Sequence, residues 1–103
     1  MAVCSIWEFR FPHETADEGF QVAQAIWQDM PHFDGYLNHR FLRDLDDPGH
    51  LLVVSRWRDR ERADKVRDEY AGHPNARRAD SLVTEPRRRF VAQDLGPAAD
   101  AEE

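Results

Sequence analysis

Residues 34–60, DGYLNHRFLRDLDDPGHLLVVSRWRDR, predict two β-strands joined by a tight turn. The first strand is expected over residues 36–45 and the second over residues 50–57. Between them, Pro48 fixes φ and Gly49 accepts positive φ, which is typical of a turn. The second strand contains the apolar run Leu-Leu-Val-Val, which is too short for a helix and favours a strand covered on both faces.

Further elements flank this hairpin on both sides. Residues 2–11 alternate in polarity with a period of two, which predicts a strand with an aromatic face. Apolar residues at spacings of three and four then predict an amphipathic helix that ends near Pro31. Two short helices are expected over residues 58–70 and 75–83, and a last strand over residues 87–95.

The order β-α-β-β-α-β, with the second helix broken, predicts an α+β fold. It is the ferredoxin-like arrangement, an antiparallel sheet with helices on one face. Thr15, with Glu18 in a capping box, and Asp59 are the expected helix N-caps. One layer of helices covers only one face of the sheet, whereas the apolar run of the hairpin faces both ways. We therefore expect a homodimer in which a second subunit covers the other face.

Composition and charge limit the functional classes. The chain has 103 residues and 41% hydrophobic content, which fits one globular domain over residues 1–95 followed by an acidic, disordered tail over residues 96–103. The net charge of −6 argues against binding to nucleic acid. The sequence shows no secretory signal, no segment of the roughly 20 apolar residues that span a bilayer, and a single cysteine, Cys4. A cytoplasmic protein that binds no membrane is expected.

The hairpin resembles that of the antibiotic biosynthesis monooxygenase (ABM) family. The resemblance rests on Asp-Gly-Tyr-Leu at residues 34–37, Leu-Arg-Asp at 42–44, Asp-Pro-Gly at 47–49 and Val-Val-Ser-Arg-Trp at 53–57. It spans about residues 2–95. It implies a dimeric α+β barrel with a pocket between helices and sheet in each subunit.

Two branches of the family imply two chemistries. One branch oxidises polyketide phenols to quinones without metal or flavin, and its Asn and Tyr positions hold Val53 and Ala63 in this chain. The other branch binds and degrades heme, and its Asn and Trp positions hold Trp7 and Val66. The histidine nearest to its heme ligand is His73. Of both motifs, this chain keeps only the hairpin tryptophan.

An aromatic cluster is the candidate substrate-binding site. Trp57 shares a strand face with Ser55, and its indole can stack on a planar substrate and donate its N–H, or serve as plain core. The other residues expected to bind the substrate from this side are Trp7, Phe9, Trp27, Ser55 and Tyr70.

Polar residues inside the first hairpin strand are further candidates. Asn38 and Arg40, candidate substrate-binding residues, are expected to share a face with Tyr36, and His39 to lie on the opposite face. A buried polar group costs roughly 1–3 kcal/mol unless it is paired, so those that point inward need a partner or a ligand. Because histidine titrates near neutral pH, His39 or His73 is the expected general base.

The other charged residues suggest ordinary surface roles. His13, His32 and His50 are expected to be solvated, and the spacing of the five histidines supports no metal site. The cluster Arg87-Arg88-Arg89 at the start of the last strand is expected to discourage aggregation at a sheet edge or to bind an acidic substrate.

The resemblance and the aromatic faces support three functional hypotheses. The leading one is oxygenation of an aromatic polyketide-type metabolite by molecular oxygen without a cofactor, or a related proton-transfer or cyclisation step, with Trp57 and one of two histidines, His39 or His73, as catalytic residues. The second is heme binding and degradation, with heme as the ligand. The third is a non-catalytic dimeric accessory protein that shields an intermediate for a partner enzyme.

Overall fold

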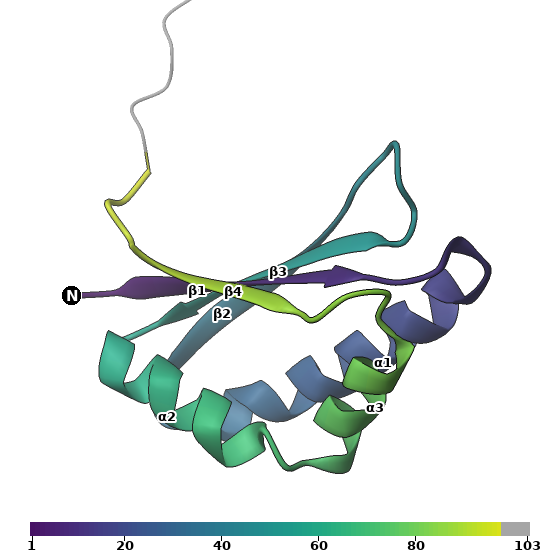
Figure 1. Cartoon of the computed structure of the whole chain (residues 1–103). Helices are drawn as coiled ribbons and strands as arrows, with labels where there is room; N and C mark the ends of the chain where they lie inside the picture. Colours follow the sequence, from purple (N-terminus) through teal and green to yellow (C-terminus); the bar gives the residue numbers. More distant parts are fainter. Residues whose placement is uncertain (98–103) are drawn as a thin grey trace, which may run out of the picture.

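A computed structural model describes residues 1–97 as an antiparallel sheet with helices on one face (Figure 1). The strands are β1 (Val3–Arg10), β2 (Tyr36–Arg43), β3 (His50–Trp57) and β4 (Arg88–Gln93). The helices are α1 (Ala16–Asp29), α2 (Arg60–Tyr70) and α3 (Pro74–Leu82), with short 3-10 turns at His13–Thr15 and Met30–His32. The predicted α+β, ferredoxin-like order is confirmed. Most of the tail predicted over residues 96–103 lies outside the described residues.

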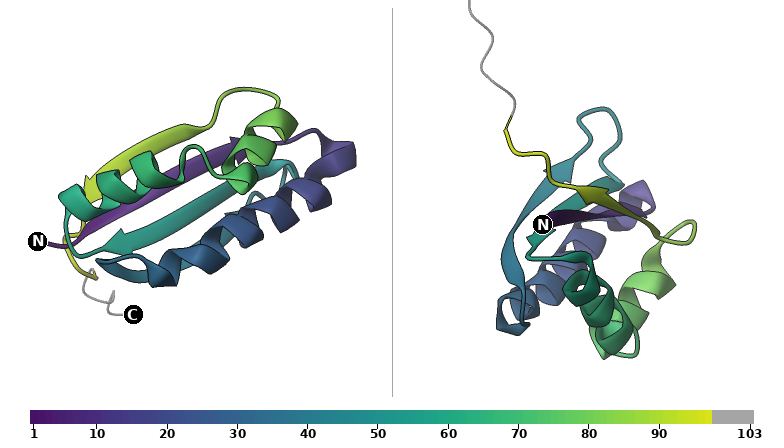
Figure 2. Two further views of the ribbon diagram at one scale, coloured as in Figure 1. Left: turned by 90° about the horizontal axis from the view of Figure 1, so that it is seen from below. Right: turned by 90° about the vertical axis from the view of Figure 1, so that its left-hand side faces the viewer.

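The strands are ordered β2-β3-β1-β4, so β1 and β3 occupy the centre of the sheet. All neighbouring strands are antiparallel, and Trp7 of β1 pairs with Val53 of β3 on one side and with Arg89 of β4 on the other. Helix α1 lies beneath the β2–β3 side and helices α2 and α3 beneath the β1–β4 side (Figure 2). Within residues 1–97, no element covers the opposite face of the sheet.

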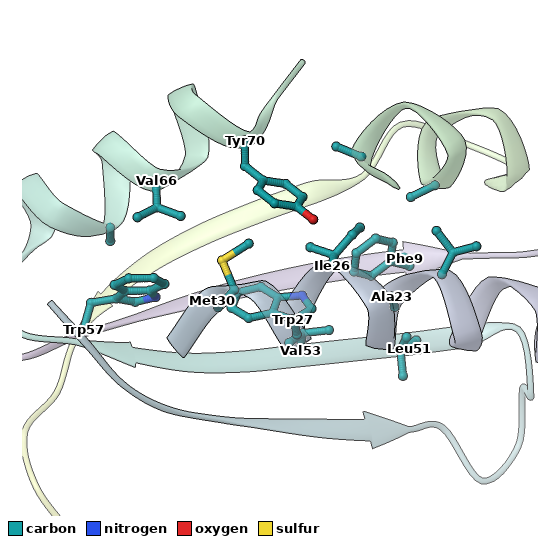
Figure 3. Packing of buried hydrophobic residues seen from close by; sticks show 14 of the residues in the cluster. Phe9, Ala23, Ile26, Trp27, Met30, Leu51, Val53, Trp57, Val66 and Tyr70 are labelled. Atoms are coloured by element: carbon teal, nitrogen blue, oxygen red, sulfur yellow. The ribbon is translucent and has the colours of Figure 1, made fainter. Parts of the chain in front are cut away.

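The hydrophobic core lies between the sheet and the helices, where the apolar faces of the strands and helices pack together (Figure 3). Burial alternates along β3, with Leu51, Val53, Ser55 and Trp57 buried toward the helices. The buried stripe of α1 consists of Ala16, Gly19, Val22, Ala23, Ile26 and Trp27. Full burial of one large apolar side chain stabilises the fold by about 1.5–3 kcal/mol, so this shared layer holds the elements together.

The hairpin turn is fixed to the end of β1. The amide of Phe11 donates to the carbonyl of Gly49 at 2.8 Å, and the amide of Gly49 donates to Asp47 Oδ1 at 3.1 Å. A Cβ at Gly49 would lie 2.0 Å from the carbonyl oxygen of Phe11. Glycine is therefore required here by close backbone approach; the expected positive φ at Gly49 is wrong, because only Gly35 and Gly96 adopt it among the described residues.

An irregular register at the start of β2 changes which residues share a face. Tyr36 pairs with Trp57 and Asn38 with Arg56, so Leu37 is an extra residue at a β-bulge. The bulge turns Tyr36 toward the helices, where its hydroxyl lies 2.6 Å from Nδ1 of His39. The expectation that Tyr36 shares a face with Asn38 is therefore wrong.

Two of the helices begin with a side-chain cap, and one does not. Asp59 Oδ1 accepts the amide of Arg62 at 2.9 Å, which confirms the predicted cap of α2. His73 Nδ1 accepts the amide of Asn75 at 3.1 Å at the start of α3. Thr15 makes no side-chain cap, so the predicted capping box is wrong; a 3-10 turn leads directly into α1 instead.

Candidate active site

A cavity of about 80 Å³ lies between the sheet and the helices. It is lined by Ser5, Trp7, Phe9, Ile26, Trp27, Met30, Trp57, Ala63, Val66, Arg67, Tyr70, Ala71, Ala76 and Arg87. Its wall is mainly aromatic and aliphatic, as in most small-molecule sites, although such sites usually measure roughly 300–1,000 Å³. A bicyclic or larger ligand therefore requires side chains at the cavity wall to move.

Trp57 lines the cavity, lies at one end of the labelled core residues in Figure 3 and is held in place by hydrogen bonds. Its side chain is 1% exposed, and its indole Nε1–H donates to Ser55 Oγ at 2.9 Å. Ser55 Oγ in turn donates to the carbonyl of Ser5 at 3.0 Å. The indole N–H, a candidate donor to a substrate, is thus already paired with the protein. Trp57 offers a ligand only the surface of its ring, and Ser55 fixes that ring without lining the cavity.

A second part of the wall consists of Trp7 and Arg87, and Arg89 packs near Trp7 without lining the cavity. The guanidinium of Arg87 lies 4.8 Å from the ring centroid of Trp7, and that of Arg89 lies 5.9 Å away. The side chains of Arg87 and Arg89 are only 16% and 11% exposed. Among the three consecutive arginines, only Arg88 is an exposed residue, so the expected exposed edge cluster is wrong for the other two. Because side chains alternate between the two faces of a strand, Arg87 and Arg89 both point inward.

Tyr70 lines the cavity from the end of α2, and His73 packs against Tyr70. The Tyr70 hydroxyl donates to Asp29 Oδ2 at 2.7 Å, and the imidazole of His73 stacks on the Tyr70 ring with centroids 4.3 Å apart. Burial, with a smaller contribution from Asp29, raises the pKa of Tyr70 to about 12. Nε2 of His73 lies 3.9 Å from Asp29 Oδ2. His73 does not line the cavity and touches it only through Tyr70.

The sequence comparisons point to one family. A family model described as antibiotic biosynthesis monooxygenase matches residues 2–71. This chain belongs to the ABM family. A search of curated proteins found no match.

Solved structures share the fold of this ABM domain at low sequence identity. A variant of SnoaB from Streptomyces nogalater, described as a cofactor-independent oxygenase, matches with a TM-score of 0.82 and 15% identity over 96% of this chain and 98% of that chain. A protein of Nitrosomonas europaea described as an antibiotic biosynthesis monooxygenase matches with a TM-score of 0.77 and 13% identity over 95% of this chain and 94% of that chain. A protein from Deinococcus radiodurans matches with a TM-score of 0.71 and 23% identity over 98% of this chain and 99% of that chain.

The ABM fold brings together half of the ten candidate residues. Those that line the cavity are Trp7, Phe9, Trp27, Trp57 and Tyr70. His39 packs against Trp27, with ring centroids 5.6 Å apart, and does not line the cavity. Burial lowers the pKa of His39, which keeps its imidazole neutral near pH 7. Asn38 and Arg40 are exposed on the opposite face of the sheet and do not reach the cavity.

Sequence reasoning missed several residues of this cavity. Arg67 and Arg87 line it, together with small and aliphatic residues of the helices. The alternation of Arg87 and Arg89 along the strand was the one available signal. It places both on one face but does not show which face turns inward.

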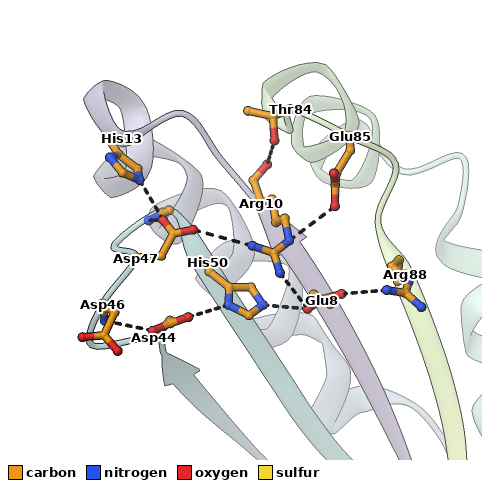
Figure 4. A network of polar contacts seen from close by, with 11 residues as sticks. Glu8, Arg10, His13, Asp44, Asp46, Asp47, His50, Thr84, Glu85 and Arg88 are labelled. Carbon is orange, nitrogen blue, oxygen red and sulfur yellow. Dashed lines mark hydrogen bonds and ion pairs between the residues drawn. The ribbon is translucent and has the colours of Figure 1, made fainter.

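His50 lies in a polar network on the outer face of the ABM sheet, away from the cavity (Figure 4). Its side chain is 15% exposed, and Nε2 lies 2.6 Å from Glu8 Oε2, while Nδ1 lies 2.9 Å from Asp44 Oδ2. These hydrogen bonds to Asp44 and Glu8 raise the pKa of His50. The expectation that His50 is solvated is therefore wrong, because two carboxylates enclose it.

Neither a cluster of metal ligands nor a membrane-spanning helix is found among residues 1–97. Residues 1–97 contain no group of three or more His, Cys, Asp or Glu side chains arranged to hold a metal ion. Among the helices of this region, none is both long enough and apolar enough to cross a membrane.

Proposed function

We propose that this ABM-family protein is a cofactor-independent monooxygenase that acts on an electron-rich aromatic metabolite of the polyketide type. The observation that carries the proposal is the cavity walled by Trp7, Trp27 and Trp57 between sheet and helices. Flat aromatic walls suit a planar substrate. An apolar enclosure also excludes water from a reactive intermediate. The likeness to SnoaB, described as a cofactor-independent oxygenase, agrees with this choice.

The proposed reaction needs no cofactor because the substrate itself supplies the electrons. A phenolate passes one electron to molecular oxygen, and the two radicals combine into a C–O bond at the ring. The O–O bond then breaks, and the attacked ring carbon becomes a second carbonyl. One oxygen atom leaves as water with the phenolic proton and the ring proton. The balanced change is one phenol and one O₂ to one quinone and one water.

Each candidate residue receives a role that its position permits. Trp57 and Trp7 hold the plane of the substrate ring. Tyr70 relays the phenolic proton toward Asp29, because its hydroxyl already donates to the half-exposed Asp29 carboxylate. Asp29 is the proposed acceptor of that proton. Nδ1 of His73 already accepts the amide of Asn75, so its other nitrogen faces Asp29 as an N–H and orients the carboxylate. His39 is screened from the cavity by Trp27.

Two alternatives fit the geometry to different degrees. Heme binding fits poorly, because a heme needs far more room than about 80 Å³. His73 also turns its ring nitrogens to Asn75 and toward Asp29 and not into the cavity. A non-catalytic accessory protein is favoured by one observation. Ala63 and Val53, which occupy the polar motif positions of the oxygenase branch, offer no polar group to a ligand.

We propose that the protein acts as a homodimer joined through the outer face of the sheet. Ile6 of β1 pairs with Val54 and with Phe90, and Leu42 pairs with Leu52, so apolar residues adjoin across all four strands. Phe90 is 48% and Leu42 43% exposed in the single chain. A second copy is the proposed occupant because covering this face would complete the barrel implied for ABM domains.

The proposal is tested by oxygen uptake with an anthrone as the probe and ¹⁸O₂ as the label. We expect one ¹⁸O atom in the quinone product. Asp29→Asn should lower kcat/KM about 100-fold, because the asparagine amide still accepts the hydrogen bond of Tyr70 but does not take up its proton. Asp17→Asn, at an exposed position of the same helix, is the matched control.

Two outcomes separate the competing functions. Anthrone binding without oxygen uptake would show a non-catalytic binding protein. Equal turnover in Asp29→Asn and the wild type would remove the Tyr70–Asp29 relay from the mechanism.

A further inference from the structure

The ionised groups that line the cavity are all cationic. Arg67 and Arg87 are the lining residues that carry charge, and Tyr70 stays neutral because its pKa is about 12. Among residues 1–97, no carboxylate and no histidine belongs to the lining. A substrate that entered as a neutral phenol would therefore find no strong base within the cavity itself, but it would find positive charge.

Arg87 is the better buried of the two cations and is held by Asp80 and Trp7. Its Nε donates to Asp80 Oδ1 at 2.6 Å and its Nη2 to Asp80 Oδ2 at 3.3 Å. Its guanidinium also lies over the Trp7 ring. These contacts leave Nη1 without a hydrogen-bond partner among the described residues. Arg67 is 42% exposed, and its Nε donates to Asp68 at 2.9 Å.

The ion pair with Asp80 leaves much of the Arg87 charge effective inside the cavity. Asp80 is 54% exposed, whereas Arg87 is 16% exposed. Asp80 is also absent from the cavity lining. Solvent screens the exposed carboxylate more strongly than the buried guanidinium, and charges act more strongly where water is excluded.

We propose that Arg87 binds the aromatic substrate as its oxyanion, a phenolate, and so selects phenols that ionise inside the cavity. This inference rests on the proposed function and names the form of substrate that the same site accepts. A cation within about 4–6 Å lowers the pKa of a neighbouring acid by roughly 1–3 units. The phenolate is also the form that passes an electron to oxygen. The site thus promotes ionisation by charge, and Tyr70 with Asp29 only carries the proton away.

The test uses 4-nitrophenol, whose anion absorbs visible light, so its ionisation is read while it is bound to the full chain. In the wild type, the pKa of the bound phenol should fall at least one unit below that of the free phenol. Arg87→Met removes the charge but keeps the length of the side chain, and it should abolish this shift. Arg88→Met is the matched control, because Arg88 is exposed, and it should keep the shift.

A second variant and a neutral ligand keep the test decisive if Arg87→Met fails to fold. Asp80→Asn removes the acid that neutralises Arg87 and should preserve the shift or enlarge it. The ether 4-nitroanisole carries no ionisable group and should bind at least tenfold more weakly than 4-nitrophenol at pH 8.

Four results would overturn the proposal. They are a bound phenol that ionises like the free one, an equal loss of the shift in Arg88→Met, loss of the shift in Asp80→Asn, and equal binding of the ether. Because every readout is binding or ionisation, the inference can hold even if oxygen uptake fails.

Discussion

Glu8 and Asp44 each face one ring nitrogen of His50, so the imidazole donates both of its hydrogen bonds as a cation. The bond to Asp44 and then that to Glu8 raise the folded-state pKa above the ordinary value of about 6.5, and Arg10 opposes the rise. A raised folded pKa means that folding favours the protonated form. Its stabilisation is fully present below the unfolded pKa and is lost as pH rises through the folded pKa.

His50→Gln should therefore change how stability depends on pH. Below pH 6.5 the variant should be about 1–3 kcal/mol less stable than the wild type, because charged hydrogen bonds to two carboxylates are lost. This difference in unfolding free energy should become smaller as pH rises through the folded pKa of His50. Urea unfolding between pH 6 and pH 9 measures it, with His32→Gln as the control. A gap that stays constant with pH would contradict the prediction.

At the scale of single residues, the alternation of side chains along the strands could be predicted from the sequence. The inward face of β1 and β3 was predictable, so Trp7, Phe9 and Trp57 were placed correctly on the helix side. The environment of His50 was not predictable, because Glu8 lies 42 residues away and reaches it only through the β1–β3 register. Arg87 was misread for the same reason, since its inward direction depends on how β4 pairs with β1.

At the scale of elements, the strands and helices follow their sequence patterns, and the differences arise at their ends. The strand β3 spans the predicted residues, and α2 begins beside its predicted cap. The bulge at Leu37 carried no glycine or proline as a signal, so the orientation of Tyr36 was missed. The cap at Thr15 failed because the preceding 3-10 turn already feeds the chain into α1.

The two predicted caps should differ in their effect on stability. Asp59→Ala should destabilise the fold by about 1 kcal/mol, within the range of roughly 0.5–2 kcal/mol for lost N-caps. Asp59→Asn should recover most of the loss, because asparagine also accepts the amide of Arg62. Thr15→Ala should change stability by much less, since its hydroxyl makes no cap bond. Thermal and urea unfolding of the three variants measure this, and equal losses at both positions would refute the assignment.

At the scale of the whole molecule, the helices cover one face of the sheet and leave an outer face on which apolar residues adjoin across the strands beside a polar network (Figure 4). Stable protein interfaces bury about 1,600 Å² in total. The outer face spans four strands, with Ile6, Val54 and Phe90 side by side across its centre. The apolar run of the hairpin predicted this two-sided character, and the alternating burial of β3 shows it in the single chain.

Val54→Lys should convert the proposed dimer to a monomer. A charge at the centre of an apolar interface is costly to bury, whereas in a single chain the same lysine extends into solvent. Sedimentation or light scattering at micromolar concentration measures the mass. Gln24→Lys on the exposed side of α1 is the control and should stay dimeric. A wild type that remains a monomer at these concentrations would refute the dimer.

The place of β4 in the sheet affects the order in which the protein becomes active during folding. Strand β4 pairs with β1 between residues as distant as Val3 and Gln93, whereas the β2–β3 hairpin closes locally. Contacts between distant residues form slowly, because the chain loses more entropy in closing the longer loop. Arg87 reaches the cavity only when this last strand docks. A refolding chain should therefore recover its helices and hairpin first and its affinity for an anionic ligand last, so ligand binding reports completed folding.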